Sequence, residues 1–293
     1  MDQSILIKRV RISDYIITAL IYAAASLSIL LLAGIVCYTF VKGVSSISWQ
    51  FLTTVPSTIK GTFGIAGNLL NTLYIVIITL LIATPVGVGS AIYLNEYAKP
   101  GKIVSTIEFT TEILSGIPSI IFGLFGMVFF GNTLGLGYSI LNGALTLTLM
   151  VLPLIVRNTQ EALRTVPDSY RSGALGMGAT KWYMIRTILL PSAKSGILTG
   201  VILAVGRIVG ESAALLFTAG SARTLIKFGG SGVENVGKIF EKALQPGGTL
   251  TIELYLQMQN GKYDVAFGIG CVLIIIVLMI NILLKLITGN RGK

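Results

Sequence analysis

Six long apolar runs constrain the fold of this sequence more than any other feature. A run of about 20 mainly apolar residues is long enough to cross the hydrocarbon core of a membrane as a helix. With 53% hydrophobic and 12% charged residues, the chain is also far less charged than a soluble domain, which carries about 25%. We therefore predict an all-α integral membrane protein with six transmembrane helices. The expected spans are 15–41, 68–93, 106–130, 139–156, 192–219 and 265–287.

These spans form one expected transmembrane domain over residues 15–287, between an N-terminal segment 1–14 and a tail 288–293. The first run is too long for the core of a signal peptide, so we expect it to be retained. Most Lys and Arg residues fall in the loops that include both termini and segment 157–191. Loops rich in Lys and Arg face the cytoplasm. We thus expect a multi-pass protein of the plasma or inner membrane with both termini cytoplasmic and with external loops 42–67 and 221–264.

Composition excludes several other functions. The chain has no histidine, which removes histidine-based catalysis and histidine metal sites. The cysteines Cys37 and Cys271 both lie in apolar runs, so no disulfide framework or metal spacing is present. No phosphate-binding loop of the type G-x-x-x-x-G-K-[ST] occurs, so ATP is not bound by that route. We expect no catalytic residue, metal or cofactor. The formal charge of +10 indicates topology and contact with lipid headgroups rather than nucleic acid.

Two ionisable residues, Arg207 and Glu211, lie inside the fifth apolar run. A charge near the bilayer centre costs about 2.5–3.5 kcal/mol, so such side chains face the interior of a bundle. Their spacing of four residues places them on one face of a helix, where they can pair. One interpretation is a structural ion pair that locks helix packing. The other, which we favour, is a polar lining of a translocation path, with Arg207 meeting an anion or neutralising Glu211.

The third run carries a second group of polar residues. Glu108 and Glu112 lie four residues apart near its cytoplasmic end, and Pro118 follows within S-G-I-P-S. Proline removes a backbone hydrogen bond and kinks a helix, and broken membrane helices expose backbone groups along substrate paths. We assign Glu112 and Pro118 to the candidate path, with an ordinary packing kink as the alternative. Glu112 has two candidate partners, Arg157 and Arg207.

Segment 157–191 is the longest polar interval in the middle of the chain. Pro167 fits the first turn of a helix that Asp168 or Ser169 would favour electrostatically. Small residues dominate 172–179, so another surface can approach the backbone closely. An amphipathic stretch with aromatic residues follows, and Pro191 ends the segment. Such a helix suits insertion into a groove on a partner. The residues alone favour equally a helix that rests on lipid headgroups.

The motif in this segment resembles the loop motif of ABC importer permeases, Glu-Ala-Ala, then Gly, then Ile-x-Leu-Pro. That resemblance implies coupling helices that sit in a cleft of an ATPase subunit, and it implies an ABC importer permease fold. Ser172 stands where the family has Glu, so the carboxylate is absent or is supplied by Asp168 or Glu161. The residues that we assign to ATPase coupling are Ser172, Gly173, Ala174, Gly178, Ile188, Leu190 and Pro191.

Further stretches are similar to the membrane subunits of the phosphate ABC importer, its A-type permease in particular. They are S-A-I-Y-L-N-E-Y-A-K (90–99), G-I-P-S-I-I-F-G-L-F-G-M-V-F-F (116–130), I-V-R-N-T-Q-E-A-L-R-T-V-P (155–167), G-A-T-K-W (178–182) and G-R-I-V-G-E-S-A-A-L-L-F-T-A (206–219). This resemblance implies a heterodimer with a C-type permease, two ATPase subunits and an extracytoplasmic phosphate-binding protein. It also implies import of inorganic phosphate by alternating access, driven by ATP that the partner hydrolyses.

Three alternatives stay open from the sequence. A permease for sulfate, molybdate or another small anion would share most of these motifs. An ATP-independent channel or stand-alone transporter often shows an internal repeat, and none is visible. A membrane-embedded enzyme acting on a lipid would need a convergent nucleophile and base or a metal cluster, and the scattered carboxylates offer neither.

Overall fold

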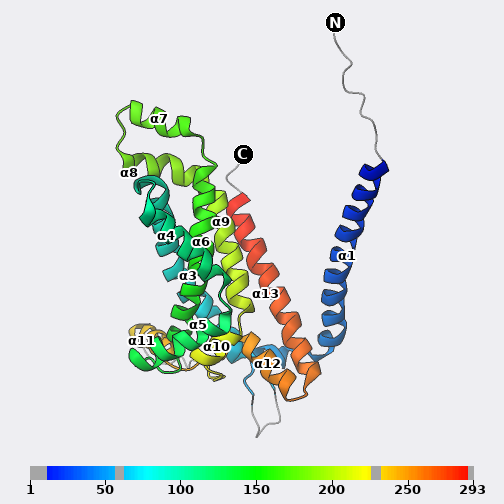
Figure 1. Ribbon diagram of the computed structural model, residues 1–293. Helices are drawn as coiled ribbons and strands as arrows, with labels where there is room; N and C mark the ends of the chain where they lie inside the picture. Colours follow the sequence, from blue (N-terminus) through cyan, green and yellow to red (C-terminus); the bar gives the residue numbers. More distant parts are fainter. Residues whose placement is uncertain (1–11, 57–62, 226–231, 290–293) are drawn as a thin grey trace.

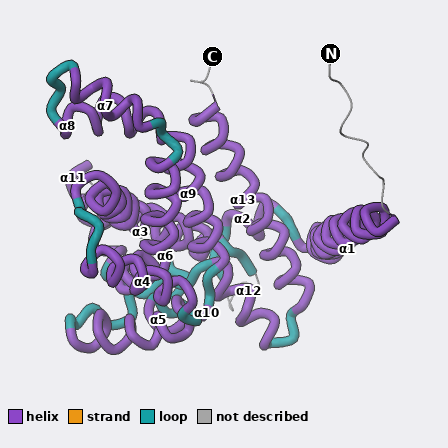
Figure 2. The backbone as a smooth tube through the Cα atoms, turned by 45° about the horizontal axis from the view of Figure 1, so that its top comes forward, coloured by secondary structure: helices purple, strands orange, loops and turns teal. Residues whose placement is uncertain are grey.

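The computed structural model describes residues 12–56, 63–225 and 232–289, and these residues form helices and loops without a strand (Figures 1 and 2). Within them, five helices are long and apolar enough to cross a membrane, and a bent pair of helices raises the number to six. The all-α prediction is therefore confirmed, and the number of spans is six when the bent pair counts as one. The positive clusters at 8–11 and 291–293, used to orient the chain, lie outside the described residues.

The spans are α1 (Ile12–Gly43), α3 (Ala66–Ile92), the pair α4 (Lys102–Gly116) and α5 (Ser119–Gly126), α6 (Ile140–Arg164), α9 (Leu190–Gly210) and α13 (Tyr263–Gly289). The shorter elements are η1 (Val44–Ser46), α2 (Trp49–Thr53), η2 (Tyr93–Tyr97), η3 (Met127–Thr133), α7 (Asp168–Gly176), α8 (Lys181–Met184), η4 (Ile185–Leu189), α10 (Ala213–Thr218), α11 (Gly232–Ala243) and α12 (Leu250–Gln259).

Helix α6 lies at the centre of the bundle, between α3 and α9. Its apolar face is buried, and Leu147, Val151 and Ile155 have almost no exposed surface. Glycine permits one close approach, because a Cβ atom built on Gly87 of α3 would stand 2.7 Å from Cγ2 of Ile155. Membrane helices pack closely at small residues because lipid supplies no hydrophobic driving force between them. This three-helix core fixes the positions of the polar side chains described below.

The third span is broken where the sequence predicts a kink. α4 ends at Gly116, Ile117 has an extended backbone, and Pro118 precedes the first residue of α5. The two helices meet at 101°, because proline has no N–H to continue the ladder and disfavours a helical residue before it. The predicted break is confirmed. α5 then packs against α10, and a Cβ atom on Gly123 would lie 2.7 Å from Cα of Ala214.

The fifth span differs from the prediction at both of its ends. Helical structure begins at Lys181, so Pro191 does not end the preceding segment but lies in the first turn of α9. The π-helical turn η4 comes just before it, where the N–H that proline lacks would otherwise be needed. At the other end, α9 stops at Gly210 rather than continuing to residue 219.

Helix α1 stands apart from the bundle along most of its length (Figures 1 and 2). All residues from Ser13 to Ile35 are exposed. Near its C-terminal end α1 packs on α13, where the ring of Tyr38 meets that of Phe267 edge to face. A Cβ atom on Gly43 would come within 2.3 Å of the Phe267 carbonyl oxygen. Among the described residues, nothing therefore covers most of this apolar helix.

The two ends of the bundle differ in structure (Figure 1). The start of α1, the end of α13 and the α7–α8 hairpin lie at one end; α10, α11 and α12 lie at the other. The predicted external loop 221–264 thus contains helices α11 and α12. The segment after α10 is held to the start of α3, since the Asn71 amide donates to the Ala222 carbonyl at 3.1 Å. Arg223 also forms an ion pair with the buried Glu253 of α12, with 2.6 Å between Nε and Oε2.

Candidate functional site

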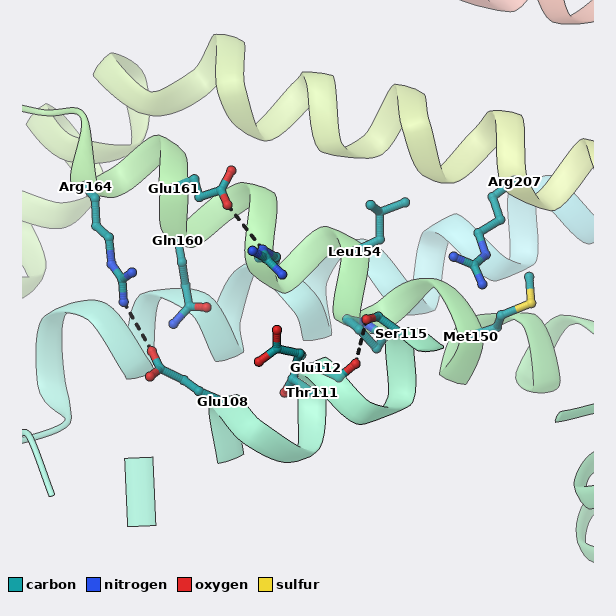
Figure 3. Close-up of a pocket in the computed structure, with 12 residues that line it drawn as sticks. Glu108, Thr111, Glu112, Ser115, Met150, Leu154, Gln160, Glu161, Arg164 and Arg207 are labelled. Carbon is teal, nitrogen blue, oxygen red and sulfur yellow. Dashed lines mark hydrogen bonds and ion pairs between the residues drawn. The ribbon is translucent and has the colours of Figure 1, made fainter. Parts of the chain in front are cut away.

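A cavity of about 380 Å³ opens between α4, α6 and α9. It contains three arginines and three glutamates, together with hydroxyl and amide side chains (Figure 3). Its lining residues are Glu108, Thr111, Glu112 and Ser115 from α4, Met150, Pro153, Leu154, Arg157, Gln160, Glu161 and Arg164 from α6, and Arg207 from α9. The buried face of α6 therefore gives way to a polar wall toward the α7–α8 end.

Two ion pairs occupy the part of this wall near the end of α6. Arg157 Nε lies 3.3 Å from Glu161 Oε1 within α6, and Arg164 Nη2 lies 3.2 Å from Glu108 Oε1 across to α4. All four side chains are exposed. Exposed ion pairs contribute little stability, so these pairs chiefly balance charge at the mouth of the cavity. Of its ionisable groups, only Glu112 and Arg207 remain outside these pairs.

Arg207 is half-buried on α9 and reaches into the cavity beside Met150 (Figure 3). Within the described part of the chain it has no hydrogen-bond or ion-pair partner. Glu112, on α4, faces the same cavity and likewise has no side-chain partner there. Neither pairing predicted for Glu112 forms, because Arg157 binds Glu161 and Arg207 stays unpaired. An unpaired guanidinium in a polar cavity is a group whose donors an anion would satisfy.

Arg207 and Glu211 do not share a helix face, so that prediction was wrong. Glu211 has an extended backbone after the last turn of α9, with φ −82° and ψ 128°. Its carboxylate Oε1 instead accepts a hydrogen bond of 3.1 Å from the Ala214 N–H at the start of α10. The four-residue spacing applies only inside a continuous helix. A carboxylate that accepts a hydrogen bond from the N–H groups at the start of a helix is favourable. Glu211 makes this bond to α10 instead of continuing α9 by a further turn.

Pro118 and Glu211 stand outside the lining of the cavity, at breaks in their spans. Conversely, sequence reasoning missed Gln160. This residue is 8% exposed, and its Nε2 has no hydrogen-bond partner among the described residues. A buried amide donor without a partner is uncommon. Its position three residues after Arg157, on the same face of α6, is the signal that could have identified it.

The helical hairpin α7–α8 forms the second candidate site. Pro167 precedes α7, which begins at Asp168 as predicted. A small separate core holds the hairpin on the ends of α6 and η4, and it includes Leu163, Ala174 and Met184. Gly178 has φ +82°, a conformation that suits glycine, in the turn that joins the two helices. The sequence pattern therefore specifies this hairpin locally.

The hairpin exposes apolar and small residues on its outer surface. Met177 is 85% exposed, and the other exposed large side chains are Tyr170, Leu175, Trp182 and Tyr183. Of the residues assigned to coupling, Ser172, Gly173, Gly178 and Pro191 are exposed, Ile188 and Leu190 are half-buried, and Ala174 is buried. A Cβ atom on Gly173 or Gly178 would meet nothing within 4 Å. No crowding within the chain thus requires small residues at these positions.

Comparison with known proteins identifies relatives of the same kind. A family model described as "Binding-protein-dependent transport system inner membrane component" matches residues 83–290. A probable ABC transporter permease protein, YqgI of Bacillus subtilis, is 42% identical over 74% of this chain and 74% of its own length. The phosphate transport system permease protein PstA of Xylella fastidiosa (strain Temecula1) is 40% identical over 61% of this chain. The match spans 62% of that relative's length.

A solved structure shares the fold. It is the crystal structure of a bacterial alginate ABC transporter in complex with an alginate pentasaccharide-bound periplasmic protein, and it superposes with a TM-score of 0.66. The match covers 96% of this chain and 96% of the other chain at 16% identity. At that identity the likeness concerns the arrangement of helices alone.

Proposed function

The chain belongs to the family of binding-protein-dependent transport system inner membrane components, and from this premise we propose that it is the permease subunit of an ATP-driven importer of inorganic phosphate. As a member of that family it is a transport subunit and not an enzyme. Phosphate is the proposed substrate because relatives named as phosphate permeases match long stretches of the chain.

One observation carries the proposal that an anion passes here. Arg207 lies unpaired in an open polar cavity whose other arginines are matched by glutamates. A phosphate oxyanion would accept hydrogen bonds from its guanidinium and also from the free Nε2 of Gln160. Glu112 faces the same space, and its negative charge would repel a bound anion and so shorten the time for which it stays. We also propose that Pro118 and Glu211 belong to this path. They would shape it indirectly, because they stabilise the helix breaks at which α5 and α10 begin.

We propose that the α7–α8 hairpin docks on an ATPase subunit. Its exposed apolar side chains and open glycines support this proposal over a helix that only rests on lipid, because small residues allow a protein surface to come close. Ser172, Gly173, Ala174, Gly178, Ile188, Leu190 and Pro191 are the proposed coupling residues. Asp168 is the carboxylate most available in place of the Glu that Ser172 replaces, since its side chain is 97% exposed.

The proposed complex contains a C-type permease, two ATPase subunits and an extracytoplasmic phosphate-binding protein. The uncovered length of α1 supports a second permease, because residues 13–35 of this helix and most of α4 are exposed within the described part of the chain. We place both termini and the α7–α8 end in the cytoplasm, and the α10–α12 end outside. ATP binding would then close the ATPase pair and move the hairpin, so that the bundle opens outward to receive phosphate.

One experiment distinguishes phosphate import from import of another oxyanion and from transport that needs no ATP. The complex is produced with its partner subunits and reconstituted in liposomes with ATP inside and the binding protein outside. We expect labelled phosphate to enter only with ATP and to resist excess sulfate or molybdate. Uptake blocked by sulfate or molybdate would replace the substrate and keep the importer. Uptake that needs no ATP would contradict the importer itself.

A further inference from the structure

We propose that Arg171 is a positioning residue that transmits the movement of the docking helix α7 to the transmembrane helix α3 through Glu96. This inference rests on the proposed function, because it assumes that α7 follows an ATPase subunit. It concerns residues that lie outside the coupling motif and outside the cavity. Glu96 belongs to η2, the π-helical turn that continues α3 beyond Ile92.

Arg171 is hydrogen-bonded both to the turn that continues α3 and to the end of α6. Its Nη2 lies 2.9 Å from Glu96 Oε1, and its Nε lies 3.3 and 3.4 Å from the two carboxylate oxygens. The same guanidinium donates to the carbonyl oxygens of Leu163 and Val166, both at 2.9 Å, at the end of α6 and just beyond it. The fork of donors on arginine matches a carboxylate bidentately and leaves further donors free. One side chain of α7 is therefore fixed to both α3 and α6.

The pair between Arg171 and Glu96 differs from the other ion pairs at this end of the bundle in its burial. The Glu96 side chain is 5% exposed and that of Arg171 is 18% exposed, whereas both pairs in the cavity are exposed. Arg171 also meets Asp168 at 3.0 Å, but Asp168 is almost wholly exposed. Water and salt screen an exposed pair, whereas a buried pair is screened much less, and separating it would leave a buried charge without a partner. Of the two carboxylates that Arg171 contacts, Glu96 therefore restrains its side chain more strongly than Asp168.

A second cation reaches the same turn from the other helix of the hairpin. Lys181, at the start of α8, lies with its ammonium 4.9 Å from the centre of the Tyr97 ring. Glu96 is also held from within η2 by the Asn95 amide at 2.8 Å. Apart from these contacts α7 packs chiefly on α8. A shift of α7 therefore reaches α3 by a direct, charge-assisted route, in addition to the apolar core shared with α6.

The test uses Glu96→Gln in the full reconstituted complex, with phosphate uptake and ATP hydrolysis measured in the same vesicles. Glutamine keeps the shape and removes the charge, so α7 should still dock and the ATPase should still turn over. Coupling between sites typically amounts to at least about fivefold, and we expect the phosphate moved per ATP hydrolysed to fall by at least that factor. Arg171→Lys, which keeps the charge but not the fork, should lower the ratio as well.

The matched control is Glu241→Gln, which removes an exposed carboxylate of α11 at the opposite end of the bundle. It should keep the wild-type ratio. A wild-type ratio in Glu96→Gln would overturn the inference. So would a parallel loss of uptake and hydrolysis that merely follows the amount of assembled complex, since a structural role predicts that result. Failure of the proposed function looks different, because the wild-type complex itself would then take up no phosphate with ATP.

Discussion

Single residues in the cavity are distinguished by whether they have a partner. The charges of the exposed pairs Arg157–Glu161 and Arg164–Glu108 cancel locally. Of the cavity arginines, Arg207 alone has no partner among the described residues, so its donors are free for a ligand. A half-buried cation without a counter-charge carries a desolvation cost, which a passing anion would offset. Arg207 is therefore the residue at which charge on the path is most directly testable.

We expect Arg207→Ala to abolish phosphate uptake while the complex still assembles, because the substitution removes the one unmatched cation of the cavity. Arg207→Lys keeps the charge without the bidentate fork and should retain part of the uptake. Uptake in liposomes and co-purification of all subunits measure the two effects separately. Normal uptake by Arg207→Ala would reduce this residue to a packing role.

For single residues, the sequence predicted which ionisable side chains belong to the candidate site better than it predicted which residues they contact. It identified Arg207 and Glu112, and both line the cavity. It failed where the partner lies far along the chain or where a helix ends unexpectedly. Glu96 and Arg171 are 75 positions apart, and a single sequence holds no signal that joins them. The Arg207–Glu211 spacing misled because it presupposes a helix that α9 does not continue.

Helices and their breaks were predictable wherever the signal is local. Pro118 and Pro167 mark the starts of α5 and α7 because proline restricts its own backbone and that of the preceding residue. The end of α9 at Gly210 has no such marker. It depends on the cap that Glu211 gives to α10 and on the packing of α10 against α5, so only the folded arrangement specifies it.

Gly123→Ala should destabilise the contact between α5 and α10. The added methyl group would lie 2.7 Å from Cα of Ala214, and overpacking of this kind costs about 1–3 kcal/mol. We expect a lower midpoint of thermal unfolding in detergent. Gly116→Ala is the matched control on the same broken span, because its Cβ would meet nothing within 4 Å. Equal midpoints for the two variants would show that α5 and α10 separate without cost.

The molecule as a whole has a packed centre and uncovered flanks. α6 is largely buried, while most residues of α4 and α1 are exposed within the described part of the chain. The sequence predicted six spans but could not show this difference, since an apolar helix reads alike whether it faces lipid, its own bundle or another subunit. The helices α11 and α12 of the predicted external loop 221–264 were missed because, at 12 and 10 residues, they are too short for the apolar runs that indicate a membrane span.

If the second permease covers α1, the sequence of its exposed part should decide assembly. We expect exchange of residues 13–35 for an alternating Leu-Ala helix of equal length to lower recovery of the second permease by about tenfold, equivalent to about 1.4 kcal/mol. Native residues 36–43 preserve the contact with α13, so the thermal midpoint of the isolated subunit should not change. Undiminished recovery would show that the second permease binds elsewhere.

Because, among the described residues, α1 contacts α13 closely only near Gly43, a small rotation there would move its other end a long way. A helix of 32 residues is about 48 Å long at 1.5 Å per residue, so turning it by about 10° at this contact would sweep its far end through about 8 Å. The space at Gly43 admits no side chain beside the Phe267 carbonyl, and residues 13–35 are all exposed, so this contact would be the pivot of such a turn. A neighbour resting on α1 would be displaced far more than the bundle that holds it.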